Sequence, residues 1–133
     1  MTDYESIDVL RAHGIKPSAQ RIAVASWVLQ TQSHPSADEV YRRVASTVPM
    51  ISRATVYNTL NLLVDKGLLR KVVLTEGHIR FDPNLERHHH FIDDQGGKIY
   101  DVPWSAVRVG GLEALEGFEV RDHQVVMRGR RTG

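Results

Sequence analysis

The sequence predicts an α+β fold: an N-terminal winged helix-turn-helix domain, residues 1–83, followed by a small C-terminal α/β domain, residues 84–133. Two observations lead to this prediction. Four segments with helical spacing of apolar residues are followed directly by two β-prone runs around a short turn, which is the element order of a winged helix. The rest of the chain holds three further β-prone runs and one short helical segment, which is too little to cover both faces of a sheet.

Composition limits the classes of protein that the chain can belong to. Its 133 residues are 41% hydrophobic, enough for one domain or two very small ones with a real core. No apolar run approaches the roughly 18–20 residues that span a membrane, and the start lacks the basic and apolar regions of a signal peptide, so we expect a soluble cytoplasmic protein. The chain has no cysteine, which excludes disulfides and thiolate zinc sites. Nitrogen and oxygen must therefore hold any metal.

The first two helices are predicted from apolar spacing and from the residues that end helices. The first covers residues 4–13, where Ile7 and Leu10 share a face and Gly14 ends the helix. The second follows Pro17, a residue that favours the first helical turn. Its apolar residues recur at helical spacing: Ile22, Ala25, Val28 and Leu29.

The third and fourth helices have clearer starts. A Ser-x-x-Glu capping box at Ser36 and Glu39 opens the third, whose apolar stripe is Ala37, Val40, Tyr41 and Val44. The fourth begins near Ser52, runs to Lys66 and stops at Gly67. Its inward residues are Val56, Leu60, Leu63 and Val64.

A hairpin and a DNA-reading helix complete the first domain. The β-prone runs 69–74 and 78–81 flank Thr75-Glu76-Gly77, a hairpin signal. In a winged helix one helix enters the major groove while the hairpin touches the DNA backbone, and residues 52–61 suit that helix. Its outward residues supply phosphate donors, a base-edge amide and an aromatic ring: Arg53, Thr55, Tyr57, Asn58 and Asn61. The alternative is an ordinary amphipathic helix with a polar face.

The second half reads as a small sheet with one helix. Runs 91–92 and 99–102 flank the turn 94–97, a helix is predicted from Pro103 with Leu112 and Leu115 in the core, and a third strand is predicted over 118–127. Such a sheet has a poorly covered face, so we expect a symmetric dimer that reads a palindromic operator in double-stranded DNA. The basic tail 128–133 is expected to be mobile.

Three consecutive histidines are the most informative feature of the chain. If a strand begins at His88, then His88 and His90 point to one face and His89 to the other. Asp82 and Asp101 flank them, and imidazole with carboxylate suits iron(II), manganese(II) or zinc(II). The alternative interpretation is a polar strand end with solvated histidines.

Several motifs, in this order, resemble those of the Fur family of metal-responsive transcriptional regulators over nearly the whole chain. They are His34-Pro-Ser-Ala-Asp-Glu-Val-Tyr41, Ser52-Arg-Ala-Thr-Val-Tyr-Asn-Thr-Leu60, Gly67-Leu-Leu, Arg80-Phe-Asp82, His88-His-His-Phe91 and Gly97-Lys-Ile-Tyr-Asp101. The resemblance implies an N-terminal winged helix, a C-terminal dimerisation domain and a regulatory metal at the hinge between them.

The resemblance also implies which residues act. The metal ligands would be His34, Asp82, His88, His90 and Asp101. The metal would be iron(II) or manganese(II), with zinc(II) also binding in vitro. The DNA contacts would be Lys16, Arg21, Arg53, Tyr57 and Asn58, to which the helical pattern adds Thr55. Many relatives carry arginine where Asn58 stands, and an asparagine that reads a base edge favours adenine.

The chain departs from the family in its zinc site. Many members hold a structural zinc with two Cys-x-x-Cys pairs, whereas here the first pair falls at Asp93 and Gly96 and the chain has no cysteine for the second. We therefore expect no structural zinc of this cysteine-bound kind, and an exposed strand end at Asp93 rather than an oxygen site. Apolar packing should hold the domain instead, through Phe91, Ile99, Trp104, Phe118 and Val120.

The resemblance favours peroxide sensing by a repressor over its alternatives. Peroxide-sensing members tend to have aspartate at the position of Asp101, and iron(II) there would let peroxide oxidise a ligand, by resemblance His34 or His88. The alternatives are response to haem, as in the Irr branch, or to iron or manganese. A non-haem iron oxygenase and a metal-independent architectural protein are more remote alternatives. Oxidation of the protein's own ligand is stoichiometric, so we expect no enzyme.

A further metal site is also considered, because many family members bind a second metal near His89. Arg87 and Arg108 stand where its ligands would be sought, and a guanidinium offers no lone pair to a metal. His123 could therefore join His89 in a second site, but we favour His123 as a strand histidine or as part of a polar network.

Overall fold

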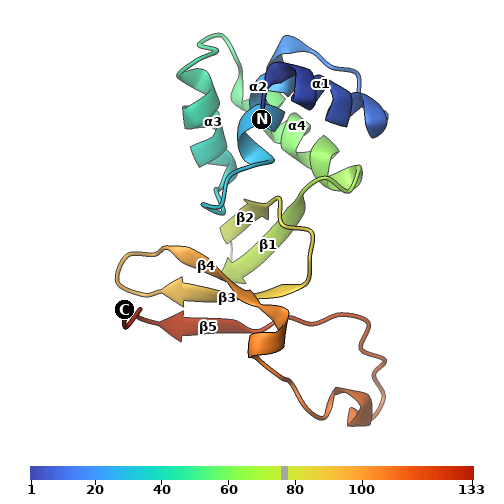
Figure 1. Cartoon of the computed structure of the whole chain (residues 1–133), viewed down its shortest axis with the longest axis vertical. Coiled ribbons are helices and arrows are strands. Elements are labelled where there is room, and N and C mark those ends of the chain that lie inside the picture. The colour runs from blue at the N-terminus through green and yellow to red at the C-terminus, as the bar shows by residue number, and fades with distance from the viewer. Residues whose placement is uncertain (76–77) are drawn as a thin grey trace. The chain divides into compact units, whose positions relative to one another are not determined.

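The computed structural model describes residues 1–75 and 78–133, and the chain divides into two compact units, Met1–Leu85 and Glu86–Gly133. Within these residues the first unit holds α1 (Asp3–Ala12), α2 (Ala19–Val28), α3 (Ala37–Ala45), α4 (Arg53–Asp65), β1 (Arg70–Thr75) and β2 (His78–Asp82) (Figure 1). The second holds β3 (His88–Asp93), β4 (Ile99–Pro103), the 3₁₀ turns Trp104–Ala106 and Leu112–Ala114, and β5 (Val126–Gly129). The predicted α+β class is confirmed.

Each helix of the first unit begins at a hydroxyl side chain. In all four, the capping oxygen accepts a hydrogen bond from the backbone N–H three residues later, which satisfies a donor that the helix itself leaves without a partner. The capping residues are Thr2, Ser18, Ser36 and Ser52. Gly14 and Gly67 follow α1 and α4 with φ of 72° and 79°, so both predicted stops are confirmed.

In the capping box predicted for α3, the Glu39 side chain has other partners than those expected. The Glu39 N–H donates to Ser36 Oγ at 3.2 Å, but the Glu39 carboxylate accepts from the Ser36 hydroxyl and from Arg80 Nη1, the latter at 2.6 Å. The carboxylate thus connects α3 to β2. The full reciprocal box lies at α1, where Thr2 Oγ1 accepts from the Glu5 N–H and the Glu5 carboxylate accepts from the Thr2 N–H.

The core of the first unit lies where the helical spacing places it. The predicted inward positions that are buried are Leu10, Ala25, Val28, Ala37, Val40, Val44, Val56, Leu60 and Leu63. Ile15, Leu69 and Phe81 join them from the loops and the hairpin. Since Phe81 belongs to β2, the same core packs the helices against the hairpin.

The hairpin pairs as the sequence predicts. β1 and β2 are antiparallel, with Arg70 opposite Asp82. The Phe81 N–H donates to the Pro35 carbonyl oxygen at 2.9 Å, which attaches β2 to the loop before α3. Of the predicted turn Thr75-Glu76-Gly77, Glu76 and Gly77 lie outside the described residues.

The second unit is a three-stranded sheet of order β4-β3-β5, in which β3 pairs antiparallel with β4 and parallel with β5. The predicted strands 91–92 and 99–102 are confirmed within β3 and β4. Among its described residues, the buried ones are His88, His89, His90 and Ile99. The interior of this unit is therefore made largely of histidine rings rather than of aliphatic side chains.

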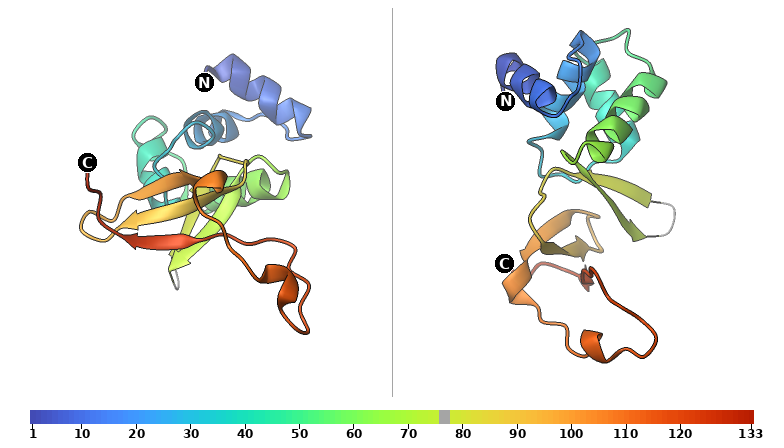
Figure 2. Two further views of the ribbon diagram at one scale, coloured as in Figure 1. Left: turned by 60° about the horizontal axis from the view of Figure 1, so that its bottom comes forward. Right: turned by 90° about the vertical axis from the view of Figure 1, so that its right-hand side faces the viewer.

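Two predictions for the second unit were wrong. The segment after Pro103 forms two 3₁₀ turns instead of a helix, and Leu115 is 48% exposed. Gly111 and Gly117, with φ of 80° and 81°, interrupt this segment, and glycine in these left-handed conformations breaks a helix. Figure 2 shows the segment looping away from the sheet.

The third strand is also shorter than predicted. It covers Val126–Gly129 rather than residues 118–127. Phe118 is 76% exposed and Val120 38% exposed, so neither belongs to the core in this single chain. A strand forms only against a neighbour, and the described part of the chain offers β3 a parallel partner only from Val126 onward. Among the described residues, none of the helices has the length and apolarity to cross a membrane.

Candidate metal centre

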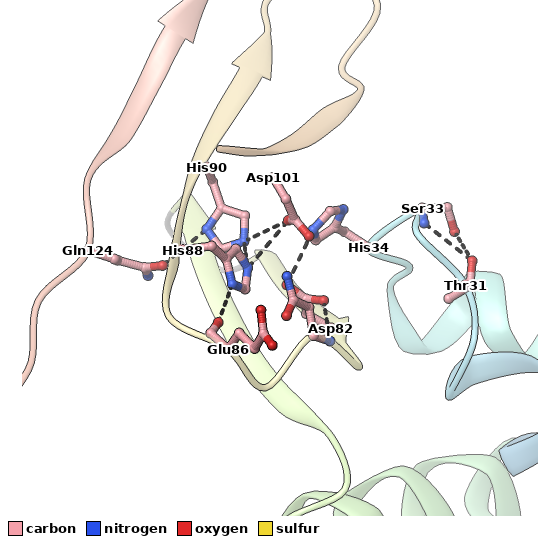
Figure 3. A network of polar contacts seen from close by, with 10 residues as sticks. Thr31, Ser33, His34, Asp82, Glu86, His88, His90, Asp101 and Gln124 are labelled. Carbon is pink, nitrogen blue, oxygen red and sulfur yellow. Dashed lines mark hydrogen bonds and ion pairs between the residues drawn. The ribbon is translucent and has the colours of Figure 1, made fainter. Parts of the chain in front are cut away.

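The first unit contributes one histidine and one carboxylate. His34 adopts φ of 52°, an uncommon conformation for a residue other than glycine, and is 2% exposed. Its Nε2 lies 3.3 Å from Asp82 Oδ2 (Figure 3). The other oxygen, Asp82 Oδ1, accepts from the Asn84 N–H at 2.9 Å, which orients the carboxylate toward the imidazole. The loop before α3 and the end of β2 therefore hold a fixed imidazole–carboxylate pair.

The second unit contributes two histidines and one carboxylate from paired strands. His88 and His90 lie two residues apart on β3 and share a face, and Asp101 on β4 lies directly opposite His90. Their side-chain atoms converge: His88 Nε2 lies 3.0 Å from His90 Nε2, and Asp101 Oδ1 lies 3.4 Å and 3.6 Å from these two nitrogens. The predicted alternation of side chains along β3 is confirmed. The β3–β4 register places Asp101 beside His88 and His90.

The second ring nitrogens of both histidines face oxygen atoms. His88 Nδ1 lies 2.6 Å from the Glu86 carbonyl oxygen, and His90 Nδ1 lies 3.1 Å from the side-chain oxygen of Gln124. A backbone carbonyl oxygen only accepts, so His88 Nδ1 carries the hydrogen, and an Nδ1–H of His90 would donate to the Gln124 oxygen in the same way. In the neutral ring the Nε2 lone pair then points into the cluster. Glu86 and Gln124 were not predicted, because nothing in their spacing links them to the histidines.

This donor set fits a divalent transition metal. Two nitrogens 3.0 Å apart can share one ion, since metal–imidazole bonds are about 2.0–2.1 Å long. Imidazole and carboxylate suit iron(II), manganese(II) and zinc(II), and second-shell acceptors on Nδ1 are typical of metal-binding histidines. The five side chains His34, Asp82, His88, His90 and Asp101 each offer one such ligand atom.

His89 lies on the opposite face of β3 among aromatic rings. It is fully buried, stacks on Trp104 with ring centroids 4.5 Å apart, and its Nδ1 accepts from the Val125 N–H at 2.9 Å. His123 lies 4.7 Å from the same Trp104 ring, and the Arg87 guanidinium lies 4.0 Å from it. The positive charge of this guanidinium beside the Trp104 ring disfavours the binding of a metal cation there. His89 and His123 therefore both lie against Trp104, and His123 precedes β5 rather than lying within a strand.

Two of the predicted DNA contacts, Arg53 and Tyr57, lie at the start of α4, and both contact the carboxylate of Asp38. Arg53 Nη1 lies 2.6 Å from Asp38 Oδ1, and the Tyr57 hydroxyl donates to the same oxygen at 3.3 Å. The Arg53 guanidinium also lies over the Tyr41 ring, 4.4 Å from its centroid. Asp38 stands in the first turn of α3, and sequence spacing does not show its contacts with Arg53 and Tyr57 of α4.

The other predicted DNA contacts gather between the start of α2 and α4. Arg21, Thr55 and Asn58 line one hollow of about 280 Å³, and Arg21 Nη1 donates to the Lys16 carbonyl oxygen at 2.9 Å. Asn58 and the Lys16 side chain are exposed. Thr55 is half-buried, and its hydroxyl accepts from the Ser52 hydroxyl at 2.9 Å, so it also belongs to the helix cap.

Comparison with known proteins assigns the chain to a family. The family model described as the ferric uptake regulator family matches residues 12–128. The chain belongs to the ferric uptake regulator family. That match covers both units and every residue of the candidate centre.

Named relatives of this family divide between peroxide and metal regulators. The peroxide-responsive repressor PerR of Staphylococcus aureus (strain Mu50) is 34% identical over 129 residues, covering 94% of this chain and 86% of PerR. The peroxide stress regulator of Campylobacter jejuni is 29% identical with a TM-score of 0.67, covering 96% of both chains. A zinc-bound manganese uptake regulator is 27% identical with a TM-score of 0.72, covering 96% of this chain and 98% of its own.

The turn where many family members place zinc-binding cysteines is held here by hydrogen bonds. Asp93 Oδ1 accepts from the backbone N–H groups of Gln95 and Gly96 at 3.0 Å and 3.3 Å. The Asp93 backbone N–H donates to the Lys98 carbonyl oxygen and its carbonyl oxygen accepts from the Gly97 N–H. The carboxylate therefore closes the β3–β4 turn itself, as aspartate commonly does in tight turns.

We expect Asp93→Ala to lower the free energy of unfolding by about 1 kcal/mol, because two backbone N–H groups lose their acceptor. Asp93→Asn, which keeps an acceptor oxygen, should stay close to wild type. The control is Asp94→Ala at the exposed neighbouring position. Urea unfolding followed by circular dichroism measures all three variants. Equal losses for the Asp93→Ala and Asp94→Ala variants would show that the carboxylate does not hold the turn.

Proposed function

We propose that the chain is a metal-dependent DNA-binding repressor that acts in the cytoplasm as a homodimer on a palindromic operator. The observation that carries the proposal is the cluster of His88 Nε2, His90 Nε2 and Asp101 Oδ1, with both histidines held by acceptors on Nδ1. Membership of the ferric uptake regulator family supports it, as does the likeness to a peroxide-responsive repressor. The physiological metal in this proposal is iron(II) or manganese(II).

Metal and DNA binding would be coupled through ligands from both units. His34 and Asp82 belong to the first unit, and His88, His90 and Asp101 to the second. A metal that binds all five selects the relative orientations of the units in which all five reach it. If those orientations also fit DNA, metal and DNA strengthen each other's binding reciprocally. Such couplings are typically about 1–3 kcal/mol, a 5- to 150-fold change in affinity.

The DNA contacts proposed for the first unit divide into two kinds. Tyr57 and Asn58 on α4 would contact bases in the major groove, with Asn58 favouring adenine. The residues proposed to contact the backbone or the minor groove are Lys16, Arg21, Arg53 and Thr55. Phosphate contacts position the protein and carry little sequence information. Specificity would therefore depend mainly on Tyr57 and Asn58.

Asp38 should weaken binding to DNA of any sequence, since it neutralises Arg53 beside the proposed DNA surface. We expect Asp38→Asn to raise affinity for a random-sequence duplex about two- to fivefold, in keeping with the ~0.2–1 kcal/mol of an exposed ion pair. The dependence of log affinity on log salt should steepen by about one unit. Fluorescence anisotropy at several salt concentrations measures both. Asp8→Asn on α1 is the control for net charge, and the same gain in that variant would contradict a local role for Asp38.

We further propose that the protein senses peroxide through one of its own ligands. His34, Asp82, His88, His90 and Asp101 would hold the iron(II), which would supply the redox chemistry that cleaves the oxygen–oxygen bond of hydrogen peroxide, while the net electrons come from the oxidised ligand. In the net change, a ring carbon of His34 or His88 gains one oxygen atom and the other oxygen leaves as water, so histidine is oxidised by two electrons and peroxide is reduced by two. An oxidised ring binds metal poorly, so the coupling to DNA is lost. Because the protein is consumed, this is a switch and not an enzymatic turnover.

The test is to load the metal-free protein with iron(II) under anaerobic conditions, add one equivalent of hydrogen peroxide, and record intact and peptide mass spectra. We expect one added oxygen on the peptide containing His34 or His88, and none when manganese(II) replaces iron(II). Failure of iron-loaded protein to gain oxygen would contradict peroxide sensing and leave response to iron, manganese or haem. DNA binding that survives chelation of all metal would contradict the metal-gated repressor itself.

A further inference from the structure

Residues 124 and 125 make three contacts with the histidine strand. The Gln124 side-chain oxygen lies 3.1 Å from His90 Nδ1, and Figure 3 shows this side chain reaching the ring from the segment before β5. The Val125 N–H donates to His89 Nδ1 at 2.9 Å, and the Val125 carbonyl oxygen accepts from the His90 N–H at 3.0 Å. The dipeptide Gln124–Val125 thus contacts the main chain of β3 and the histidine rings on both faces of that strand.

We infer that Gln124 is a positioning residue for the proposed metal centre, which it serves by fixing the tautomer and orientation of His90. This inference rests on the proposed function, since the ring that it positions is one of the proposed ligands. The direction of the hydrogen bond decides which nitrogen of His90 keeps its lone pair. An amide oxygen only accepts, so His90 Nδ1 carries the hydrogen and Nε2 keeps its lone pair toward His88 and Asp101.

Without the Gln124 oxygen as acceptor, the neutral His90 ring gains conformational and tautomeric freedom. Metal binding must then remove this freedom. The ring hydrogen can then reside on Nε2, which removes the lone pair from the cluster, and the ring can rotate about its side-chain bonds. His90 is only 1% exposed, so water is a poor substitute for the amide oxygen. Loss of an outer-shell partner typically lowers metal affinity about 10- to 100-fold.

The two histidines of the cluster differ in how they are held. His88 Nδ1 faces the Glu86 backbone carbonyl, which no side-chain substitution removes. His90 depends on a side chain that lies 34 residues further along the chain. The parallel pairing of β5 with β3, in which Val126 lies opposite His90, places Gln124 beside the ring. Gln124 is therefore a position at which a contact to a proposed ligand can be changed without altering the ligand itself.

The experiment compares Gln124→Leu and Gln124→Glu with Gln95→Leu, a control at an exposed glutamine of the same unit. Manganese(II) and zinc(II) affinities of the metal-free proteins are measured by competition with a chelating dye. We expect Gln124→Leu to weaken binding about 10- to 100-fold. Gln124→Glu keeps an acceptor oxygen and should stay within about threefold of wild type or bind more tightly, and Gln95→Leu should not differ from wild type. Thermal unfolding of the metal-free variants separates loss of affinity from loss of folding.

A second readout examines the ring directly. Long-range ¹H–¹⁵N spectra of the metal-free protein report which nitrogen of His90 carries hydrogen, and Gln124→Leu should lower the share of the Nδ1–H form while Gln124→Glu retains it. Wild-type affinity in the Gln124→Leu variant, or equal weakening in the Leu and Glu variants, would overturn the inference. If wild-type protein binds no metal at these residues, the proposed function fails, and the tautomer shares alone decide whether Gln124 positions the ring.

Discussion

Replacement of His90 by alanine should abolish metal-dependent DNA binding. His90 Nε2 lies within 3.6 Å of both other donors in the second unit, so its removal takes away one of the three converging ligand atoms. Loss of a ligand should cost more affinity than the roughly 100-fold upper range for loss of an outer-shell partner. The 5- to 150-fold gain in DNA affinity expected from metal should then vanish at micromolar manganese(II).

The measurement uses a DNA duplex selected from a random pool by the manganese-loaded wild-type protein. Anisotropy titrations with and without manganese(II) give the metal-dependent gain, and dye competition gives the metal affinity. His13→Ala, an exposed histidine at the end of α1, controls for histidine loss elsewhere. Because His90 is buried, circular dichroism must show that the His90→Ala variant keeps its fold. A folded variant with an undiminished response to metal would exclude His90 as a ligand.

The first unit could be predicted from sequence because its signals are local. Side-chain hydroxyls begin the four helices, glycines end two of them, and apolar residues recur at helical spacing, so the predicted bounds of α1 and α4 lie within a residue of those observed and most predicted core positions are buried. The alternation of His88, His89 and His90 follows from strand geometry in the same way. Local physical rules are therefore enough to predict these features.

The segment between β4 and β5 could not be predicted, because its form depends on what it packs against. The alternation around Phe118 suggested a strand, but no strand of the described chain pairs with it. Phe118 remains 76% exposed. Such exposed apolar residues are consistent with the proposed dimer, whose second copy supplies surfaces that one chain lacks.

The contacts that refine the candidate site depend on register and tertiary placement. Asp101 was assigned from resemblance, but only the β3–β4 register places it opposite His90. Gln124 and Asp38 had no distinguishing pattern, since a lone glutamine and an acid in a first helical turn are common. Their roles arise from distances to His90 and to Arg53 that sequence spacing does not encode.

Replacement of His34 by alanine should separate metal binding from its effect on DNA. The residues of the cluster, His88, His90 and Asp101, all belong to the second unit, and their ligand atoms lie 3.0–3.6 Å from one another. The variant should therefore still bind zinc(II) or manganese(II), though more weakly than wild type. Metal should no longer change DNA affinity, because the first unit would offer the metal only Asp82, whose imidazole partner is gone.

The informative quantity is the ratio of DNA affinities with and without saturating metal, measured at a metal concentration that fills the variant's own site. We expect this ratio to fall from the 5- to 150-fold range to about one. His78→Ala, an exposed histidine of the same unit, is the matched control and should keep the wild-type ratio. A ratio that persists in the His34→Ala variant would mean that metal acts within the second unit alone, through the dimer rather than through the hinge. The two outcomes distinguish a metal that links the units from one that only orders the sheet carrying the histidines.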